Sequence, residues 1–339
     1  MTATVLSTHT SALFDAAVQR AAALLRAGEV VALPTETVYG LAANALDAQA
    51  VAKIYEIKGR PAHNPIIVHV ADHAQARSCV TVWPEAAEQL ARSFWPGPLT
   101  LVLPRASSIP DIVTAGGATV GVRWPSHPFM QAVIRACSFP LAAPSANLSN
   151  AISPTNAEHV RKQLSRKLSL IVDGGQSQVG IESTVIDLTA QPPCVLRPGM
   201  IHEESLLAAL GEGLSLASVA TNPDVSNLRS PGLLKKHYAP KARLAVMAWR
   251  DNTDLDLQLT TLSAQRAKTH IIAHTHIPGG EGLAGVSVIP HDAEAFARAI
   301  YAELHRCDEA DAAMIVVESL PAGPEWRAIA DRLNRAAAD

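Results

Sequence analysis

Short apolar segments that end at proline or glycine recur along the first 210 residues, and they limit the fold more than any other feature. Residues 29–33, for example, are apolar after Glu29 and stop at Pro34. Segments of this length between turn residues are typical of β-strands. Between them, apolar residues recur at helical spacing, as in 11–27, where Gly28 ends the pattern. The alternation predicts an α/β or α+β domain.

The same patterns predict the remaining elements of this region. Further strands are expected at 66–70, 99–103, 119–123, 141–143, 170–173 and 183–188. Further helices are expected at 47–57, 84–93, 127–136, 154–167 and 202–210.

A second, smaller domain is predicted at the C-terminal end, because a chain of 339 residues is long enough for two domains. Residues 211–242 are rich in Gly, Ser, Asn and Pro and are predicted to form a linker. Beyond them, strands and helices alternate in the order of a small parallel, Rossmann-like sheet. The strands are expected at 243–248, 270–273, 286–289 and 313–317, and the helices at 254–267, 292–306 and 324–337.

The charge of the chain argues against a protein that coats nucleic acid. Its 28 Lys and Arg residues face 31 Asp and Glu residues, for a net charge of −3, whereas affinity for phosphate backbones needs a field of basic residues. Any contact with RNA is therefore expected to be local. The linker is the exception, since residues 225–250 hold basic residues and no acidic one. Such a run is either a solvated surface or a lid over a phosphate group.

The four cysteines are scattered without a C-x-x-C pair, which fits a reducing compartment. The N-terminal segment lacks the basic start of a signal peptide, and no run of 18 uncharged apolar residues occurs. We expect a cytoplasmic protein with no membrane contact.

The familiar catalytic motifs are missing. The sequence contains no G-x-x-x-x-G-K-[ST], no G-x-G-x-x-G between a strand and a helix, no G-x-S-x-G and no H-E-x-x-H. His270, His274 and His276 suggest a metal site, but neither a cysteine nor a pair of carboxylates completes a ligand set. We therefore predict no metal ligands.

Polar loops follow several of the predicted strands. Each has a structural explanation by itself: threonines cap turns, Lys58 and Arg60 complement a helix dipole, and Ser153 before Pro154 suits a helix start. Together they predict a cleft lined by Thr, Ser, Lys, Arg and His without an activated nucleophile. Such a cleft works by positioning substrates and stabilising charge, as in phosphoryl or nucleotidyl transfer.

Nine segments stand out, in the order PTETVYGL (34–41), KGRPAHNPIIVHV (58–70), WPGPLTLVL (95–103), VGVRWPSHP (120–128), APSANLS (143–149), DGG (173–175), GIESTVIDL (180–188), LRPG (196–199) and SPGLLKKHYAP (230–240). In this order they resemble the threonylcarbamoyl-AMP synthase family in its long, two-domain form. The resemblance runs from about residue 11 to 240 and is one of architecture beyond that.

The resemblance implies condensation of L-threonine, bicarbonate and ATP to threonylcarbamoyl-AMP and pyrophosphate, for the threonylcarbamoyladenosine modification of tRNAs. It implies a catalytic domain at 1–210 with a twisted, largely parallel open sheet and a concave basic cleft. The segment 211–242 becomes a linker and lid, and 243–339 a Rossmann-like domain. Mg²⁺ is expected on the phosphates of ATP, with few or no protein carboxylates holding it. Hand-off to a tRNA-modifying transferase complex and a weak tRNA or double-stranded RNA contact remain open.

The resemblance also assigns site residues. Lys58 and Arg60 are expected to neutralise charge on the triphosphate. The positions implied for L-threonine are Thr37, His69, Arg123, Ala143 and Ser183. The positions implied for ATP are Arg60, Asn64, Thr119, Ser145, Ser153, Arg197 and, from the linker, Tyr238.

Two alternatives stay open at this point. One is a related carbamoyl-adenylate transferase, although this chain lacks the acylphosphatase-like and zinc-finger segments of those relatives. The other is a non-catalytic module that binds double-stranded RNA or the ribosome, against which the net charge argues.

Overall fold

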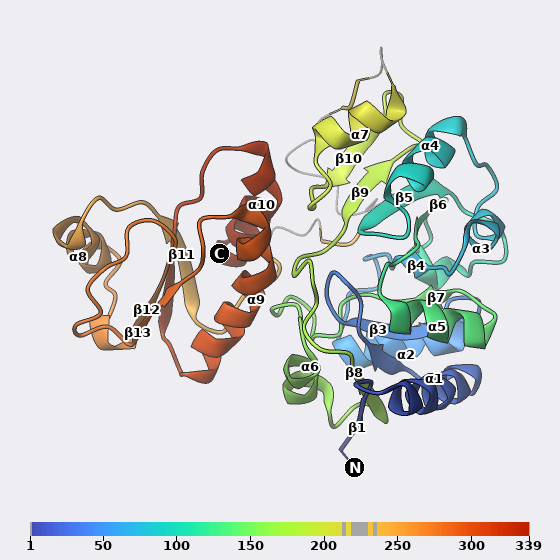
Figure 1. Cartoon of the computed structure of the whole chain (residues 1–339), viewed down its shortest axis with the longest axis horizontal. Helices are drawn as coiled ribbons and strands as arrows, with labels where there is room; N and C mark the ends of the chain where they lie inside the picture. The colour runs from blue at the N-terminus through green and yellow to red at the C-terminus, as the bar shows by residue number, and fades with distance from the viewer. Residues whose placement is uncertain (1, 212–214, 218–229, 233–235, 339) are drawn as a thin grey trace. The chain divides into compact units, whose positions relative to one another are not determined.

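A computed structural model of the chain describes residues 2–211, 215–217, 230–232 and 236–338. Its contacts divide the chain into two compact units (Figure 1). The first unit contains residues 1–149 and 153–234, and the second contains 150–152 and 235–339. The second unit therefore begins within the stretch predicted as the linker.

The first unit is built on a ten-stranded sheet with helices between the strands. Its strands are β1 (Thr4–Ser7), β2 (Val31–Leu33), β3 (Gly40–Asn44), β4 (Val68–His69), β5 (Leu99–Pro104), β6 (Thr119–Arg123), β7 (Leu141–Ala142), β8 (Leu170–Asp173), β9 (Thr184–Asp187) and β10 (Cys194–Arg197). Its helices are α1 (Ser11–Arg26), α2 (Ala48–Lys58), α3 (His73–Ser78), α4 (Glu85–Phe94), α5 (Pro128–Cys137), α6 (Ala157–Leu164) and α7 (Glu203–Leu210).

The α/β class is confirmed, but the sheet is mixed rather than largely parallel. Its order is β1-β8-β2-β3-β7-β4-β6-β5-β9-β10. Parallel ladders join β1 to β8, β4 to β6 and β5 to β9, whereas β3, β7 and β10 pair antiparallel with their neighbours. The expectation of a largely parallel sheet is wrong because β3 returns directly beside β2 without a crossover helix.

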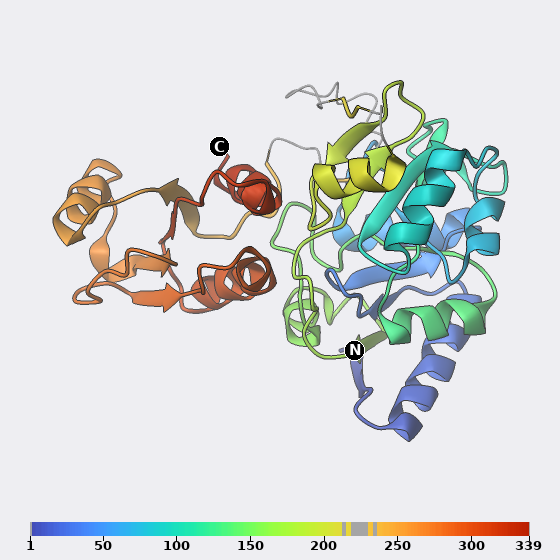
Figure 2. The same cartoon turned by 45° about the horizontal axis from the view of Figure 1, so that its top comes forward.

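Side-chain alternation along the central strands gives the sheet two buried faces. On β2, Val31 and Leu33 join one apolar cluster and Ala32 joins another. Helices α1 and α5 pack together on the first of these faces, while α2, α4, α6 and α7 contribute to the cluster on the other (Figures 1 and 2).

At the β6-β5-β9 end of the sheet, one face packs into the apolar core and the other face lines a pocket. Leu99, Leu101 and Leu103 of β5 point into the larger cluster. The alternate residues, Thr100 and Val102, point to the opposite face, where they line a pocket. The face that α1 and α5 bury at one end of the sheet is therefore open to a ligand at the other.

Local sequence explains where two important helices begin and end. Asp47 caps α2 by accepting hydrogen bonds from the backbone N–H groups of Gln49 and Ala50. The helix ends at Gly59, whose φ of 60° is left-handed and favours glycine. Helix α6 starts at Ala157 with Asn156 as its cap, so the expected start at Ser153 and Pro154 is wrong. Ser153 instead donates to Glu182 Oε1 at 2.6 Å.

The second unit contains a four-stranded, all-parallel sheet, which confirms the Rossmann-like prediction. The strand order is β11-β14-β12-β13. The strands are β11 (Arg243–Met247), β12 (Thr269–Ala273), β13 (Gly285–Val288) and β14 (Met314–Glu318), and the helices are α8 (Asn252–Thr261), α9 (Ala293–Glu309) and α10 (Arg327–Ala337). Across the described residues of both units, we find no helix with the length and apolar character needed to cross a membrane.

Candidate active site

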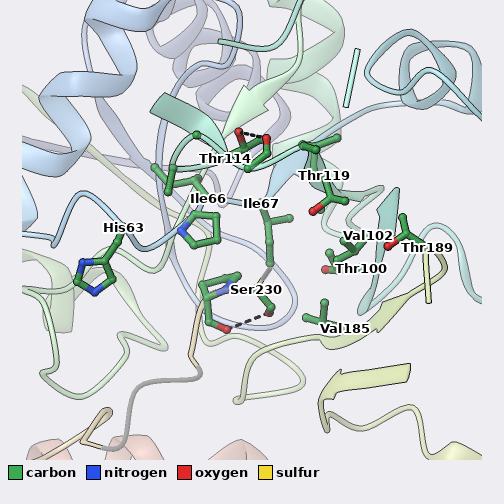
Figure 3. Close-up of a pocket in the computed structure, with 18 residues that line it drawn as sticks. His63, Ile66, Ile67, Thr100, Val102, Thr114, Thr119, Val185, Thr189 and Ser230 are labelled. Carbon is green, nitrogen blue, oxygen red and sulfur yellow. Dashed lines mark hydrogen bonds between the residues drawn. The ribbon is translucent and has the colours of Figure 1, made fainter. Parts of the chain in front are cut away.

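A pocket of about 490 Å³ opens on the first unit at the β6-β5-β9 end of the sheet. Three threonines, Thr100, Thr119 and Thr189, lie on one side of it in Figure 3, and His63 lies on the other. His63 and the segments 65–67, 114–118 and 230–231 form further parts of its walls. Hydroxyl and backbone groups therefore form much of the lining, a surface suited to a polar ligand.

Strand alternation and small residues create this lining. Thr119 and Gly121 lie two apart on β6 and share one face of the strand. A Cβ atom at Gly121 would lie 3.1 Å from Thr100 Cγ2, so a larger residue would crowd the pocket floor. Thr114 Oγ1 donates to the carbonyl of Gly117 at 2.9 Å and fixes the loop that forms the rim.

Ser183 and Arg197 connect to the pocket through hydrogen bonds. Thr100 Oγ1 and Ser183 Oγ are 2.8 Å apart, and Arg197 Nη2 donates to Ser183 Oγ at 3.1 Å. Arg197 Nη1 also donates to the carbonyl of Pro231 at 3.2 Å. A buried guanidinium thus joins β10 to the 230–231 wall, and two predicted site residues lie directly behind the pocket.

Arg123, Thr37 and Glu36 form a second polar group. Arg123 Nη1 donates to Thr37 Oγ1 at 3.0 Å, and Arg123 Nη2 lies 2.7 Å from Glu36 Oε1. This ion pair lacks hydrogen-bond geometry: neither Glu36 oxygen, nor Arg123 Nε or Nη2, has a hydrogen-bond partner among the described residues. Buried polar atoms of this kind are costly, and they commonly mark a place for a ligand.

His69 lies on β4, paired with Arg123 of β6 in the parallel ladder. Burial, and then the positive charge of Arg123, lower the pKa of His69 to about 3. The imidazole is therefore neutral at physiological pH. Its Nδ1 has no hydrogen-bond partner within the described part of the chain. Ala143, the other small position predicted here, is buried, and its N–H donates to the carbonyl of Ile67.

Lys58 is buried away from the pocket lining and holds a loop. Its Nζ donates to the carbonyls of Ser145 and Asn147, at 2.5 and 2.6 Å, and to Asn147 Oδ1 at 3.1 Å. Burial, and then the charge of Arg60, hold the pKa of Lys58 well below its ordinary value. Ser145 Oγ donates to the same Asn147 Oδ1 at 2.6 Å, so Lys58 and Ser145 meet at one point.

Arg60 and Asn64 lie next to the His63 and Pro65 wall. Arg60 donates to the carbonyl of Asn64 at 3.0 Å and to that of Pro65 at 2.7 Å. The side-chain amide of Asn64 is buried, and neither its Nδ2 nor its Oδ1 has a partner among the residues described. Thr119 is the one predicted site residue found among the 18 described residues that line the pocket.

Tyr238 lies in the second unit. Its ring stacks on Tyr301 at 6.0 Å, and the Arg332 guanidinium lies 5.5 Å from the ring centroid. Two basic residues of the predicted lid, Arg229 and Lys235, lie outside the described residues. The role of Tyr238 over a nucleotide stays a prediction.

The histidines of the second unit are held by hydrogen bonds. His274 Nδ1 lies 2.8 Å from His291 Nδ1, and His276 Nδ1 lies 2.8 Å from Glu318 Oε1. Within the described residues, no group of three or more His, Cys, Asp or Glu side chains could hold a metal ion.

Sequence reasoning missed Thr100, Thr189 and Glu36. Thr100 is the one polar residue in the predicted strand at 99–103. A polar residue inside an otherwise apolar strand was the available signal. Glu36 was part of a quoted motif but received no role. Its significance depends on its contact with Arg123, 87 positions further on, which only the folded chain supplies.

The fold defines a two-domain α/β protein whose first domain holds a pocket with a lining suited to a polar ligand. Residues 23–199 match the family model named for Sua5, YciO and YrdC, described as "Telomere recombination". Residues 201–338 match the model of the threonylcarbamoyl-AMP synthase C-terminal domain. The chain belongs to the threonylcarbamoyl-AMP synthase family. It is therefore an enzyme that forms an adenylate, a nucleotidyltransferase.

Relatives and solved structures agree over nearly the full length. The chain is 39% identical to threonylcarbamoyl-AMP synthase of Pyrococcus abyssi, over 93% of this chain and 92% of the relative. It is 41% identical to that of Bacillus subtilis, over 95% and 93%. The crystal structure of P. abyssi Sua5 complexed with L-threonine matches with a TM-score of 0.89 and 36% identity, over 99% of this chain and 98% of that one. These matches do not favour the RNA-binding alternative.

Proposed function

We propose that the chain condenses L-threonine, bicarbonate and ATP into threonylcarbamoyl-AMP and pyrophosphate. The observation that carries the proposal is the buried contact between Arg123 Nη1 and Thr37 Oγ1, at 3.0 Å. It occurs in a chain similar to a protein crystallised with L-threonine. A guanidinium beside a hydroxyl matches the carboxylate and hydroxyl of that amino acid.

On this proposal, the amino-acid subsite is formed by Thr37, His69, Arg123, Ala143 and Ser183. Arg123 binds the carboxylate through two N–H groups, and the neutral imidazole of His69 adds a hydrogen bond without adding charge. The small side chain of Ala143 leaves room beside the substrate. Support comes from the partnerless nitrogens of Arg123 and His69 in the described residues, which a ligand would satisfy.

The nucleotide subsite is formed by Arg60, Asn64, Thr119, Ser145, Ser153 and Arg197. Thr119 lines the pocket directly, and Arg197 lies behind it through Ser183 and Pro231. Mg²⁺ enters as part of the substrate, on the phosphates.

The chemistry needs no protein nucleophile. The neutral amine of threonine forms a carbamate, whose oxygen then attacks the α-phosphorus of ATP and displaces pyrophosphate. The protein contributes by positioning the reactants and by stabilising the negative charge that develops. Arg60, Arg197 and Lys58 take this second role; Lys58 also fixes the loop that carries Ser145.

Further parts of the proposal concern the surroundings of the site. Residues 211–242, with Tyr238, act as a lid that keeps water from the labile carbamate. The enzyme works in the cytoplasm, which its four free cysteines suit. It hands its product to a tRNA-modifying transferase complex, and its own contact with tRNA is weak.

The experiment is an assay of pyrophosphate release from ATP with and without L-threonine and bicarbonate. We expect release only when both are present. Release that does not depend on threonine would contradict the substrate assignment. Tight, salt-sensitive RNA binding with no release would support the non-catalytic alternative.

A further inference from the structure

Glu36 is a buried carboxylate with an unusual lack of partners. Its side chain is 7% exposed, and its one described ion-pair partner is Arg123, 2.7 Å away. Neither carboxylate oxygen has a hydrogen-bond partner within the described residues. Buried carboxylates normally accept several hydrogen bonds because the cost of removing a charge from water is high. This carboxylate therefore has capacity for a hydrogen-bond donor beyond those that the described residues supply.

The charges at this place match those of a free amino acid. Arg123 carries one positive charge and Glu36 one negative charge, while His69 is neutral because its pKa lies near 3. An amino-acid zwitterion carries one charge of each sign, on two groups bonded to the same carbon atom. When it enters, the carboxylate can pair with Arg123 and the ammonium group with Glu36, so two ion pairs replace one and no charge is left buried alone.

We propose that Glu36 binds the α-ammonium group of the amino-acid substrate and accepts the proton released when its nitrogen forms the carbamate. Glu36 is then a catalytic residue. The proton transfer rests on the proposed function, whereas the binding of the ammonium group requires only that the site binds an amino acid.

The step balances with bicarbonate as the carbon source. The ammonium group and bicarbonate give a carbamate, a water molecule and one proton. The nitrogen lone pair, freed when an N–H bond breaks, forms the new C–N bond. The C–OH bond of bicarbonate breaks, and its oxygen leaves as water with a second proton from nitrogen. The remaining proton passes to Glu36, which becomes a neutral carboxylic acid.

The neighbouring groups are less suited to this task. His69, which pairs with Arg123 in the β4–β6 ladder, is one alternative base, but a pKa of about 3 makes it a poor proton acceptor. His127 also faces Glu36: burial lowers the pKa of His127, and the negative charge of Glu36 opposes that change. The His127 ring is already engaged as the N-cap of α5, where Nδ1 accepts from the Phe129 N–H at 3.2 Å.

The test compares two ligands that differ at the amine. L-Threonine and 3-hydroxybutyrate share the carboxylate and hydroxyl, but the second lacks the amine. In calorimetry with the full chain, Glu36→Gln should weaken L-threonine binding by about tenfold or more. It should not weaken 3-hydroxybutyrate binding, because the variant removes a negative charge beside the carboxylate of that ligand. Threonine-dependent pyrophosphate release should fall by about 100-fold. Glu85→Gln, an exposed position on α4, is the matched control and should change neither.

Equal weakening of both ligands would mean that Glu36 only orients Arg123, and it would overturn the proposal. A second measurement needs no variant: the wild-type chain should bind L-threonine at least about tenfold more tightly than 3-hydroxybutyrate, and equal affinity would also overturn it. If Glu36 binds the ammonium group but the proposed reaction is wrong, threonine will bind in a Glu36-dependent way and ATP will release no pyrophosphate.

Discussion

Two buried glutamates, Glu36 in the first unit and Glu318 in the second, show how the units differ. Glu318 ends β14 and accepts hydrogen bonds from the backbone N–H groups of His274, Thr275 and His276, at 2.7, 2.8 and 3.0 Å. His276 Nδ1 adds a fourth contact at 2.8 Å. Glu36 has the ion pair with Arg123 alone among the described contacts. Within the described residues, the Glu318 carboxylate accepts four hydrogen bonds and the Glu36 carboxylate accepts none.

The difference separates structural polar groups from binding groups. Burial by itself would raise the pKa of Glu318, but the backbone and His276 donors outweigh it and lower that pKa to about 2. Its charge is therefore a stabilising part of the β12–β14 junction. In the described part of the first unit, Glu36, Asn64, His69 and Arg123 are among the buried side chains that have polar atoms without a hydrogen-bond partner. These are the atoms that a substrate would complete.

The largest effect is expected at Arg123. Arg123→Met keeps much of the side-chain length and removes the charge, so the substrate carboxylate loses its partner. We expect the kcat/KM for L-threonine to fall by a factor of about 100 or more, equivalent to about 3 kcal/mol. ATP binding should remain, as nucleotide titration would show. A variant with the wild-type kcat/KM for L-threonine would refute the assigned role.

The second effect concerns stability rather than activity. Glu318→Gln should lower the free energy of unfolding of the second unit by about 1–2 kcal/mol at pH 7 and leave pyrophosphate release unchanged. Because the folded pKa is depressed, the stabilisation is present above about pH 4.5 and is lost as the pH falls toward 2. Hydrogen exchange of β12 and β14 at pH 7 and pH 3 measures it. Glu281→Gln, an exposed position, serves as the control. Loss of activity without loss of protection would contradict the comparison.

The smallest effect is expected at Thr100. Thr100→Val keeps the shape of the side chain and removes its hydrogen bond to Ser183 Oγ, which leaves Arg197 as that hydroxyl's described partner. We expect kcat/KM to fall about three- to tenfold, which corresponds to about 1 kcal/mol. Thr81→Val, an exposed threonine, should have no effect in the same assay. An unchanged rate at Thr100 would show that Ser183 needs no orientation.

Much of the fold could be predicted from local patterns. The apolar strands β6 and β8 and the capped helix α2 lie within a residue of their predicted bounds. Strand β3 was missed because Gly40–Asn44 is rich in glycine and alanine, which are weak strand formers. Strand β1 was missed because Thr4–Ser7 merges with the helical pattern that follows. Its pairing with β8, more than 160 residues away, is a tertiary effect.

The site was predictable as a set of residue types but not as a set of contacts. The motifs located Arg123, Thr37 and Ser183. They did not show that Glu36 lies against Arg123, or that Ser153 contacts Glu182 rather than capping α6. Each of these depends on residues far apart in the sequence, so no local rule reports them.

The most direct test follows the carbon of bicarbonate into product. The wild-type chain and Arg123→Met are incubated with ¹³C-bicarbonate, L-threonine and ATP, and the adenylate is identified by mass spectrometry. We predict threonylcarbamoyl-AMP with one ¹³C atom from the wild type and about 100-fold less of it from the variant in the same time, although both bind ATP. Equal amounts of labelled product from the two chains, or none from the wild type under conditions where it binds both substrates, would contradict the account.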